Sequence, residues 1–92
     1  MHIVYDPVKS ERNRRERGLP FDCAAAFDFQ AALYAMDERR DYGETRIVAL
    51  GRIGDRVHVL CFVETDDGIR VISLRKANPR EVNRYAQNQT PD

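Results

Sequence analysis

Cations gather in the stretch from Ile69 to Tyr85, which begins as an apolar segment and continues into a pattern typical of a helix start. Five of them occur there with a single acid, Glu81, between them: Arg70, Arg75, Lys76, Arg80 and Arg84. A phosphate group accepts hydrogen bonds from several cationic donors at once, and arginine binds it through two parallel bonds. This stretch therefore indicates a site that holds an anion, and phosphate is the anion we expect.

Size and composition indicate one soluble domain. The chain has 92 residues, enough for one modest core, so we expect a single domain over residues 1–92. No apolar run approaches the roughly 20 residues that span a bilayer, and the first residues do not resemble a signal peptide. We therefore expect a cytoplasmic protein that does not bind a membrane. The net charge is zero, so any anion binding has to be local.

The two cysteines offer no metal site. Cys23 and Cys61 are far apart, and neither stands at ligand spacing from His2 or His58. Cys61 lies in an apolar segment and is expected to be a buried thiol. We expect no disulfide in a reducing compartment, no bound metal and no cofactor.

The first third of the chain predicts a short strand and two helices. Residues 2–5 are a strand candidate, and Asp6 followed by Pro7 is typical of a helix start. That helix should run to about Arg17 and end at Gly18. The apolar residues from Phe21 onward favour a short second helix. Residues 29–36 are ambiguous, with a strand favoured from about residue 31, and residues 37–44 are turn-like.

The rest of the chain predicts three strands and a final helix. The strands cover residues 45–52, 56–65 and 69–76 and are joined by short turns, which favours an antiparallel meander. Asn78, Pro79 and Glu81 form the pattern of a capping box at a helix start, and the tail after Tyr85 is expected to fray. The predicted class is α+β, with an antiparallel sheet, two N-terminal helices and one C-terminal helix packed on one side.

Strict alternation separates the cations of the last strand. It places Arg75 on one face with Ile69, and Arg70 on the other face with Leu74 and Lys76. Each strand is apolar on both faces at its centre. One face should therefore pack on helices, while the other is either covered as well or forms a binding surface.

Three groups of motifs, in this order, resemble the BrnT toxin family. The opening is similar to the family pattern W-D-x-x-K-x-x-x-N-x-x-K-H-G-x-x-F-x-x-A-x-x-x-F, here with Tyr5, Asp6, Lys9, Asn13, Gly18, Phe21, Ala24 and Phe27. Gly43-Glu44-x-Arg46, followed by Gly51, resembles its G-E-x-R strand. The run from Ile69 to Ala77, with Glu81 and Tyr85 behind it, resembles its ending I-R-I-I-S-A-R-K-A…E…Y. The resemblance extends over nearly the whole chain.

The resemblance implies a RelE-like fold and a ribonuclease toxin that blocks translation. It also implies a BrnA-like antitoxin that neutralises the toxin and carries a DNA-binding domain, so that operator DNA is bound only through the antitoxin. The chain departs from the family pattern at three points. Tyr5 replaces the tryptophan, Glu16-Arg17 replaces Lys-His, and the phenylalanine after Ala24 comes one residue early. If the missing histidine moves a proton in the family, this chain is a weak or altered nuclease. If that histidine only packs or binds phosphate, Arg17 can substitute for it.

Cutting RNA without a metal requires three kinds of group. A base activates the 2′-hydroxyl, cations stabilise the charge on the phosphoryl oxygens, and an acid protonates the leaving 5′-oxygen. We expect Arg46, Arg70 and Arg75 to contact the phosphate, Glu44 to act as a base and Lys76 as an acid. Lys9, Arg80, Arg84 and Tyr85 are the candidates for RNA binding.

Each candidate also has a structural explanation. A single arginine at a strand end is usually solvated or paired with an acid, and Arg46 has Glu44 close by in the sequence. Glu81 fits a helix cap, and Tyr85 fits a core or interface position. Two further functions stay open: a non-catalytic RNA-binding module, and a module that only binds a protein partner.

Overall fold

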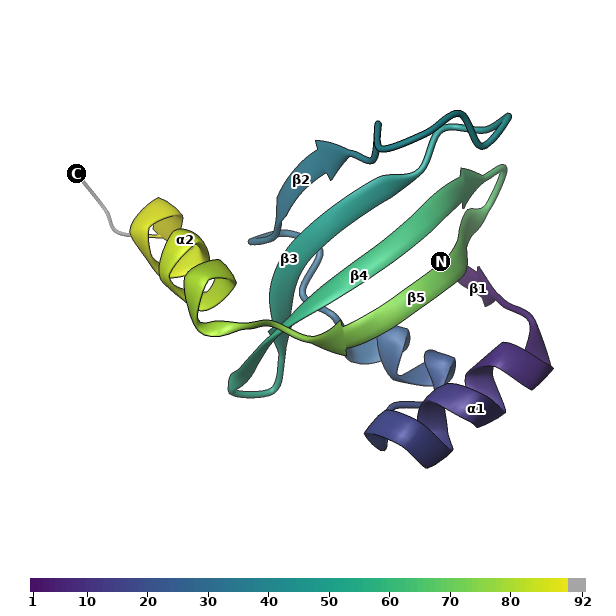
Figure 1. The fold of residues 1–92 in the computed structure, drawn as a ribbon, viewed down its shortest axis with the longest axis horizontal. Helices are drawn as coiled ribbons and strands as arrows, with labels where there is room; N and C mark the ends of the chain where they lie inside the picture. Colours follow the sequence, from purple (N-terminus) through teal and green to yellow (C-terminus); the bar gives the residue numbers. More distant parts are fainter. Residues whose placement is uncertain (90–92) are drawn as a thin grey trace.

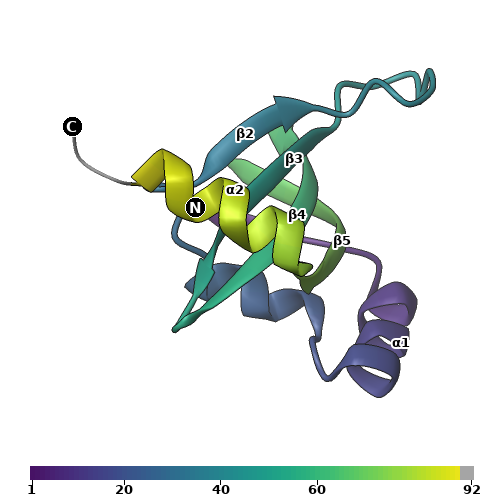
Figure 2. The same cartoon turned by 60° about the vertical axis from the view of Figure 1, so that its left-hand side comes forward.

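Five strands form one sheet, with helical elements on both of its faces (Figures 1 and 2). The structure is a computed structural model and describes residues 1–89. The order across the sheet is β1-β5-β4-β3-β2. In chain order the elements are β1 (His2–Val4), α1 (Pro7–Arg17), the 3-10 helix η1 (Phe21–Ala26), β2 (Leu33–Met36), β3 (Ile47–Ile53), β4 (Arg56–Thr65), β5 (Gly68–Lys76) and α2 (Pro79–Gln89). The expected α+β class and the meander of β3, β4 and β5 are confirmed.

Helix α1 has the predicted ends and docks through polar side chains. The Asp6 side chain accepts a hydrogen bond from the Val8 backbone N–H, and Gly18 ends the helix with φ of 69°. The Ser10 hydroxyl accepts from the Phe21 N–H at 2.8 Å. Asn13 donates from Nδ2 to the carbonyl of Leu74 in β5 at 2.9 Å, and so caps part of the open edge of that strand.

The expected second N-terminal helix is a 3-10 helix. Only six residues lie between Pro20 and Phe27, both of which have extended backbone, and such short segments favour 3-10 geometry. Phe21 and Ala24 are buried beneath the sheet. Phe27 packs so closely on β3 that a Cβ at Gly51 would lie 2.5 Å from its ring. Glycine at position 51 is therefore required by packing.

The sheet is mixed, which corrects the expectation of an antiparallel sheet. The edge strand β1 runs parallel to β5, with His2 opposite Gly68 and Val4 opposite Arg70. A Cβ at Gly68 would lie 1.8 Å from the His2 carbonyl oxygen, so the two strands meet at a residue without a side chain. A strand of three residues carries no pattern that reveals its partner, and its direction could not be predicted.

A β-bulge in β5 changes the predicted faces of that strand. Ser73 pairs with Cys61, but Val71 pairs with the next residue of β4, Phe62, so Ile72 is the extra residue. Alternation therefore restarts after Ile72, and Leu74 joins Val71 in the core. The prediction that Arg70 and Arg75 lie on opposite faces is wrong, because the bulge places both on one face.

Two apolar clusters cover the two faces of the sheet. The first lies beneath η1 and includes Phe21, Leu60 and Leu74. The second lies beneath α2 and includes Leu50 and Val59. Leu50 and its neighbour Ala49, which belongs to the first cluster, point to opposite faces. The expectation that all helices pack on one side is therefore wrong, because α2 covers the face opposite η1 (Figure 2).

Helix α2 begins with the predicted capping box. The Asn78 side chain accepts from the Glu81 N–H at 2.8 Å, and Glu81 accepts from the Asn78 N–H at 2.9 Å. The helix continues to Gln89. The expected fraying after Tyr85 is therefore wrong for residues 86–89. Residues 90–92 of the expected tail lie outside the described residues. Within residues 1–89, no helix has the length and apolar character needed to cross a membrane.

Candidate functional site

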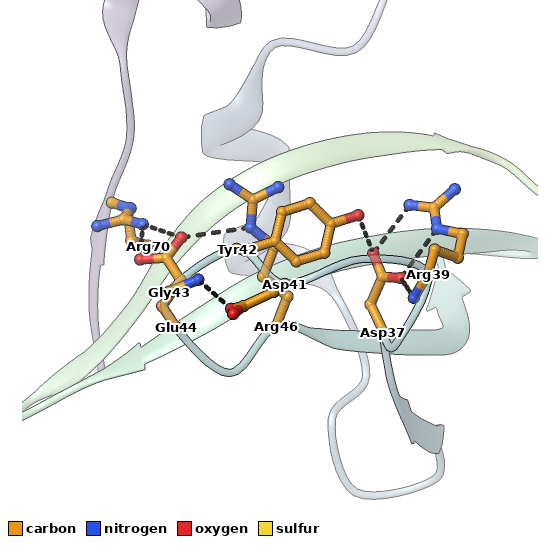
Figure 3. Close-up of polar contacts among 8 residues, drawn as sticks. All are labelled: Asp37, Arg39, Asp41, Tyr42, Gly43, Glu44, Arg46 and Arg70. Atoms are coloured by element: carbon orange, nitrogen blue, oxygen red, sulfur yellow. Dashed lines mark hydrogen bonds and ion pairs between the residues drawn. The ribbon is translucent and has the colours of Figure 1, made fainter.

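A single carboxylate, that of Glu44, joins two arginines from separate parts of the chain (Figure 3). Arg70 Nη2 lies 2.7 Å from Oε1 and 2.8 Å from Oε2 of Glu44. Arg46 Nε lies 3.2 Å from Oε2. The sequence predicted Glu44, Arg46 and Arg70 as site residues, and the structure brings these three together.

The two arginines reach the Glu44 carboxylate from two different segments of the chain, Arg46 from the position before β3 and Arg70 from β5. Arg46 directly precedes β3, and its carbonyl accepts from the Asp37 N–H at 2.8 Å, which holds the start of this strand. Arg70 pairs with Val63 of β4 before the bulge. The side chains of Glu44, Arg46 and Arg70 are 28%, 24% and 43% exposed, so the cluster is open to solvent.

The two guanidinium groups determine the charge of Glu44. Hydrogen bonding from Arg70 is the largest effect, followed among the lowering effects by hydrogen bonding from Arg46, and together they hold the pKa of Glu44 below its ordinary value. The carboxylate therefore stays ionised at neutral pH. Each arginine contacts the carboxylate through one nitrogen, Nη2 of Arg70 and Nε of Arg46, and these donors can bind a phosphate oxygen in its place.

The loop between β2 and β3 supports Arg46 from the other side. The Arg46 guanidinium carbon lies 4.0 Å from the ring centroid of Tyr42, a cation–π contact. The Tyr42 hydroxyl donates to Asp37 Oδ2 at 3.2 Å. Arg39 donates to both oxygens of Asp37 at 2.8 Å, and the Asp37 side chain is only 2% exposed. These bonds hold the pKa of Asp37 well below its ordinary value.

Three residues of this loop were missed by the sequence reasoning, which described residues 37–44 only as a polar turn. They are Asp37, Arg39 and Tyr42 (Figure 3). The available signal was a tyrosine within a polar turn, four residues before a predicted site arginine. Side-chain contacts within a loop have no regular spacing, so that signal does not distinguish Tyr42 from a solvated residue.

Arg75 has a different partner from Arg46 and Arg70. Its Nη1 and Nη2 each lie 2.9 Å from an oxygen of Glu81, the capping residue of α2. Hydrogen bonding from Arg75, followed by that from the Asn78 backbone, lowers the pKa of Glu81 to about 2. The partners of Arg70 and Arg75, Val63 and Val59, are four positions apart in β4, which corresponds to about 13 Å along the strand. Arg75 therefore shares a face with Arg70 but not a pocket.

The other predicted cations do not join the Glu44 cluster. Lys76 is exposed and pairs with His58, on the face of β5 opposite Arg75. Arg80 and Arg84 are exposed on α2, and Lys9 is on α1 at the open edge of β5. The proposed acid Lys76 is thus separated from Glu44 by the sheet.

Tyr85 lies in the core between α2 and the sheet. It is 3% exposed and belongs to the cluster that includes Leu50 and Val59. The guanidinium group of Arg52 lies 5.5 Å from its ring centroid. Its ring is not available to stack on a base, which agrees with the core position that the sequence also allowed.

Two further titratable groups, His58 and Cys61, are buried in the sheet. His58 is buried, its Nδ1 lies 2.8 Å from the Arg56 carbonyl oxygen, and burial lowers its pKa. Cys61 is a buried free thiol, as expected, and burial raises its pKa. Within residues 1–89, no group of three or more His, Cys, Asp or Glu side chains is arranged to hold a metal ion.

The sequence over residues 5–81 matches the profile of a family described as "Ribonuclease toxin, BrnT, of type II toxin-antitoxin system". The chain belongs to the BrnT family. The match includes Glu44, Arg46, Arg70 and Arg75 and ends at Glu81. Membership of a type II toxin–antitoxin family implies an antitoxin as partner. No curated protein and no solved structure matches this BrnT chain.

Proposed function

We propose that this BrnT chain is an active, metal-independent endoribonuclease that stops translation by cleaving RNA. One observation supports the proposal above the others. Arg46 and Arg70 converge on the Glu44 carboxylate in a solvent-accessible cluster, where an RNA phosphate can take the place of the carboxylate. The two guanidinium groups would then stabilise the charge that develops on the phosphoryl oxygens.

Replacement of the Glu44 carboxylate by a phosphate at the two guanidinium groups also gives Glu44 a catalytic role. In the free protein the arginines keep the pKa of Glu44 low, so its carboxylate is a weak base. When a phosphate takes over both guanidinium groups, that effect is removed and the basicity of Glu44 rises. The carboxylate then lies beside the bound nucleotide, where it can accept the proton of the 2′-hydroxyl.

The proposed reaction is an intramolecular transesterification. The 2′-oxygen forms a bond to phosphorus while its proton passes to Glu44. The bond from phosphorus to the 5′-oxygen breaks, and that oxygen takes a proton from water. The hydroxide that remains takes the proton from Glu44, which restores the carboxylate. The products are a 2′,3′-cyclic phosphate and a 5′-hydroxyl end. The positive charge comes from Arg46 and Arg70, and the proposal requires no metal ion.

An RNA-cleavage assay with the purified protein tests the proposal. We expect internal cuts in a labelled RNA, with 2′,3′-cyclic phosphate ends, at the same rate in 5 mM EDTA as in Mg²⁺. Arg70→Ala should slow the cuts by about 100- to 1000-fold, and Arg15→Ala, on the exposed surface of α1, should not. RNA that stays intact with wild-type protein at every concentration tested would contradict the enzyme proposal.

A non-catalytic RNA-binding module is the second candidate. Arg17 occupies the position where the family pattern has histidine, and the guanidinium group of arginine does not exchange protons near neutral pH. RNA that is bound but not cut by wild-type protein would favour this candidate. Restoration of cleavage by Arg17→His would show that the departure from the family pattern is the cause.

The proposed partner is a BrnA-like antitoxin, which would block the cluster and carry the DNA-binding activity of the pair. Cytoplasmic RNA is the proposed substrate. Expression of the toxin alone should stop growth and protein synthesis, and co-expression with the neighbouring antitoxin gene should restore both. Growth that is the same with and without the toxin would contradict this role.

A further inference from the structure

Helix α1 carries more positive than negative charge. It contains five cations and two acids, and Ser10 is its only buried residue. It is held by hydrogen bonds to Phe21 and Leu74 instead of by an apolar face. Helices in small proteins usually dock through apolar burial, so these bonds suggest that the exposed polar surface of α1 has a use.

A groove of about 200 Å³ separates α1 from the sheet. The residues that line it come from α1, from η1 and from the bulge of β5: Lys9, Arg12, Asn13, Glu16, Arg17, Phe21, Ile72 and Ser73. The α1 members are spaced three and four residues apart, so they form one face of the helix. Three cations and one acid give this face a positive charge.

The groove cations have free guanidinium and ammonium groups. Within residues 1–89, Lys9, Arg12 and Arg17 form no ion pair. On the opposite face of the helix, Arg14 pairs with Glu11 at 2.5 Å. A ligand in the groove can therefore bind the cations without breaking an existing ion pair.

The groove and the Glu44 cluster both include residues of β5. Ile72 follows Arg70 by two residues in β5, a distance of about 7 Å along an extended strand. The bulge places the exposed Ser73 on the face of Arg70 and directs Ile72 to the groove. A ligand that reaches from one site to the other would cross only this short piece of β5.

We propose that the groove between α1 and β5 binds an RNA phosphate next to the one that is cleaved. This inference rests on the proposed ribonuclease function and adds a second subsite to it, with Lys9 and Arg12 as the main contacts. RNA is favoured over an acidic protein segment because Arg70, the proposed phosphate contact, lies only two residues before the groove residue Ile72 in β5. Two phosphates of one strand can thus occupy both sites.

Salt-dependent binding of a 2′-O-methyl RNA, which lacks the attacking hydroxyl, tests the groove without cleavage. The double variant Lys9→Gln, Arg12→Gln removes two charges from the groove. Its control, Arg14→Gln, Arg15→Gln, removes two from the opposite face. Glutamine keeps helix propensity, so both variants should fold, and a thermal melt checks this.

We expect the groove variant to reduce the slope of log Kd against log salt by about 0.7, because the groove holds one phosphate and each phosphate contact on a single strand contributes about 0.7. The control should keep the wild-type slope. A dinucleotide, which offers only the scissile phosphate, should be cleaved equally by wild type and groove variant, while a 12-residue RNA should be cleaved more slowly by the variant.

Three results would overturn the inference. Equal slopes for the two variants would show that the groove does not bind RNA, while cleavage by the wild type would leave the proposed function intact. Weaker antitoxin binding with unchanged RNA binding would assign the groove to a protein partner. Absence of RNA binding and cleavage in the wild type would contradict the proposed function itself, and the subsite with it.

Discussion

The same face of the sheet carries two arginine–glutamate pairings, which differ in whether the carboxylate also accepts a hydrogen bond from the backbone. Glu81 accepts from Arg75 and also from the backbone N–H of Asn78 at the start of α2. Among residues 1–89, Glu44 accepts only from two guanidinium groups, those of Arg46 and Arg70. The Glu81 side chain is 15% exposed and that of Glu44 is 28% exposed.

This difference separates a structural ion pair from a candidate binding site. Removing the Glu81 carboxylate would leave the Asn78 N–H without its acceptor, so this carboxylate stabilises the start of α2. Removing Glu44 would leave two arginines facing an open surface, where another anion can bind them. Two pairs of the same chemistry are thus distinguished by their backbone contacts.

The largest predicted effect concerns the two arginines of the Glu44 cluster. We expect Arg46→Ala and Arg70→Ala each to reduce RNA cleavage by about 100- to 1000-fold, the usual loss for a donor that stabilises developing charge. Single-turnover cleavage of a labelled RNA measures the rate, and a thermal melt checks the fold. Arg15→Ala is the matched control. Wild-type rates in both cluster variants would remove the proposed site.

Arg75→Ala should act on stability instead. We expect a loss of about 0.5–1 kcal/mol in the free energy of unfolding, the range of a partly exposed ion pair. Cleavage per folded molecule should stay within about twofold of wild type, because Arg75 lies about 13 Å along the strand from Arg70. Chemical denaturation and the cleavage assay together measure this. A 100-fold loss of cleavage at unchanged stability would place Arg75 in the catalytic site, as the sequence pattern first indicated.

The pH dependence of stability should also distinguish the two carboxylates. The pKa of Glu81 is about 2 in the folded protein, below its ordinary value, so the unfolded state binds more protons as the pH falls. The stabilisation from Glu81 is complete above the unfolded pKa of about 4.3 and is lost as the pH falls toward 2. Glu81→Gln should therefore flatten the decrease in unfolding free energy between pH 6 and pH 3.

Denaturation at several pH values measures this decrease, with Glu44→Gln as the comparison. The pKa of Glu44 is also lowered, so Glu44→Gln should flatten the curve in the same direction, but less. A larger effect from Glu44 than from Glu81 would show that Glu44 is a structural group, and the proposed exchange with phosphate would be difficult.

The smallest predicted effect concerns Tyr42, which supports Arg46. Tyr42→Phe keeps the ring under the guanidinium group but removes the hydrogen bond to Asp37. We expect cleavage to fall about two- to fivefold, the rate equivalent of a hydrogen bond worth roughly 0.5–1 kcal/mol. Substrate titration should show the change in kcat and not in KM. An unchanged kcat would show that the hydrogen bond from Tyr42 to Asp37 does not contribute to catalysis by the Glu44 cluster.

Local patterns in the sequence predicted most elements of the fold. The caps of both helices depend on neighbouring residues, such as Asn78 and Glu81, and they were correctly predicted. The parallel pairing of β1 and the position of α2 depend on contacts between distant residues, which no local pattern records. The bulge at Ile72 could not be predicted because one extra residue in a strand leaves the hydrophobic pattern readable in two ways.

The same distinction applies to the candidate site. Residue types and the family resemblance identified Glu44, Arg46 and Arg70. They did not reveal that Arg75 is bound to the helix cap or that Lys76 faces the other side of β5, because both facts depend on the bulge. The contacts of Tyr42 depend on loop geometry and had no regular signature.

The most direct test is a titration of ¹⁵N-labelled protein with a 2′-O-methyl RNA, monitored through the arginine Nε–H signals by NMR. Arginine-to-lysine variants assign the signals. If phosphate replaces the Glu44 carboxylate, the signals of Arg46 and Arg70 shift on saturation while that of Arg75 stays in place. A shift of the Arg75 signal with unchanged Arg46 and Arg70 signals would contradict this account.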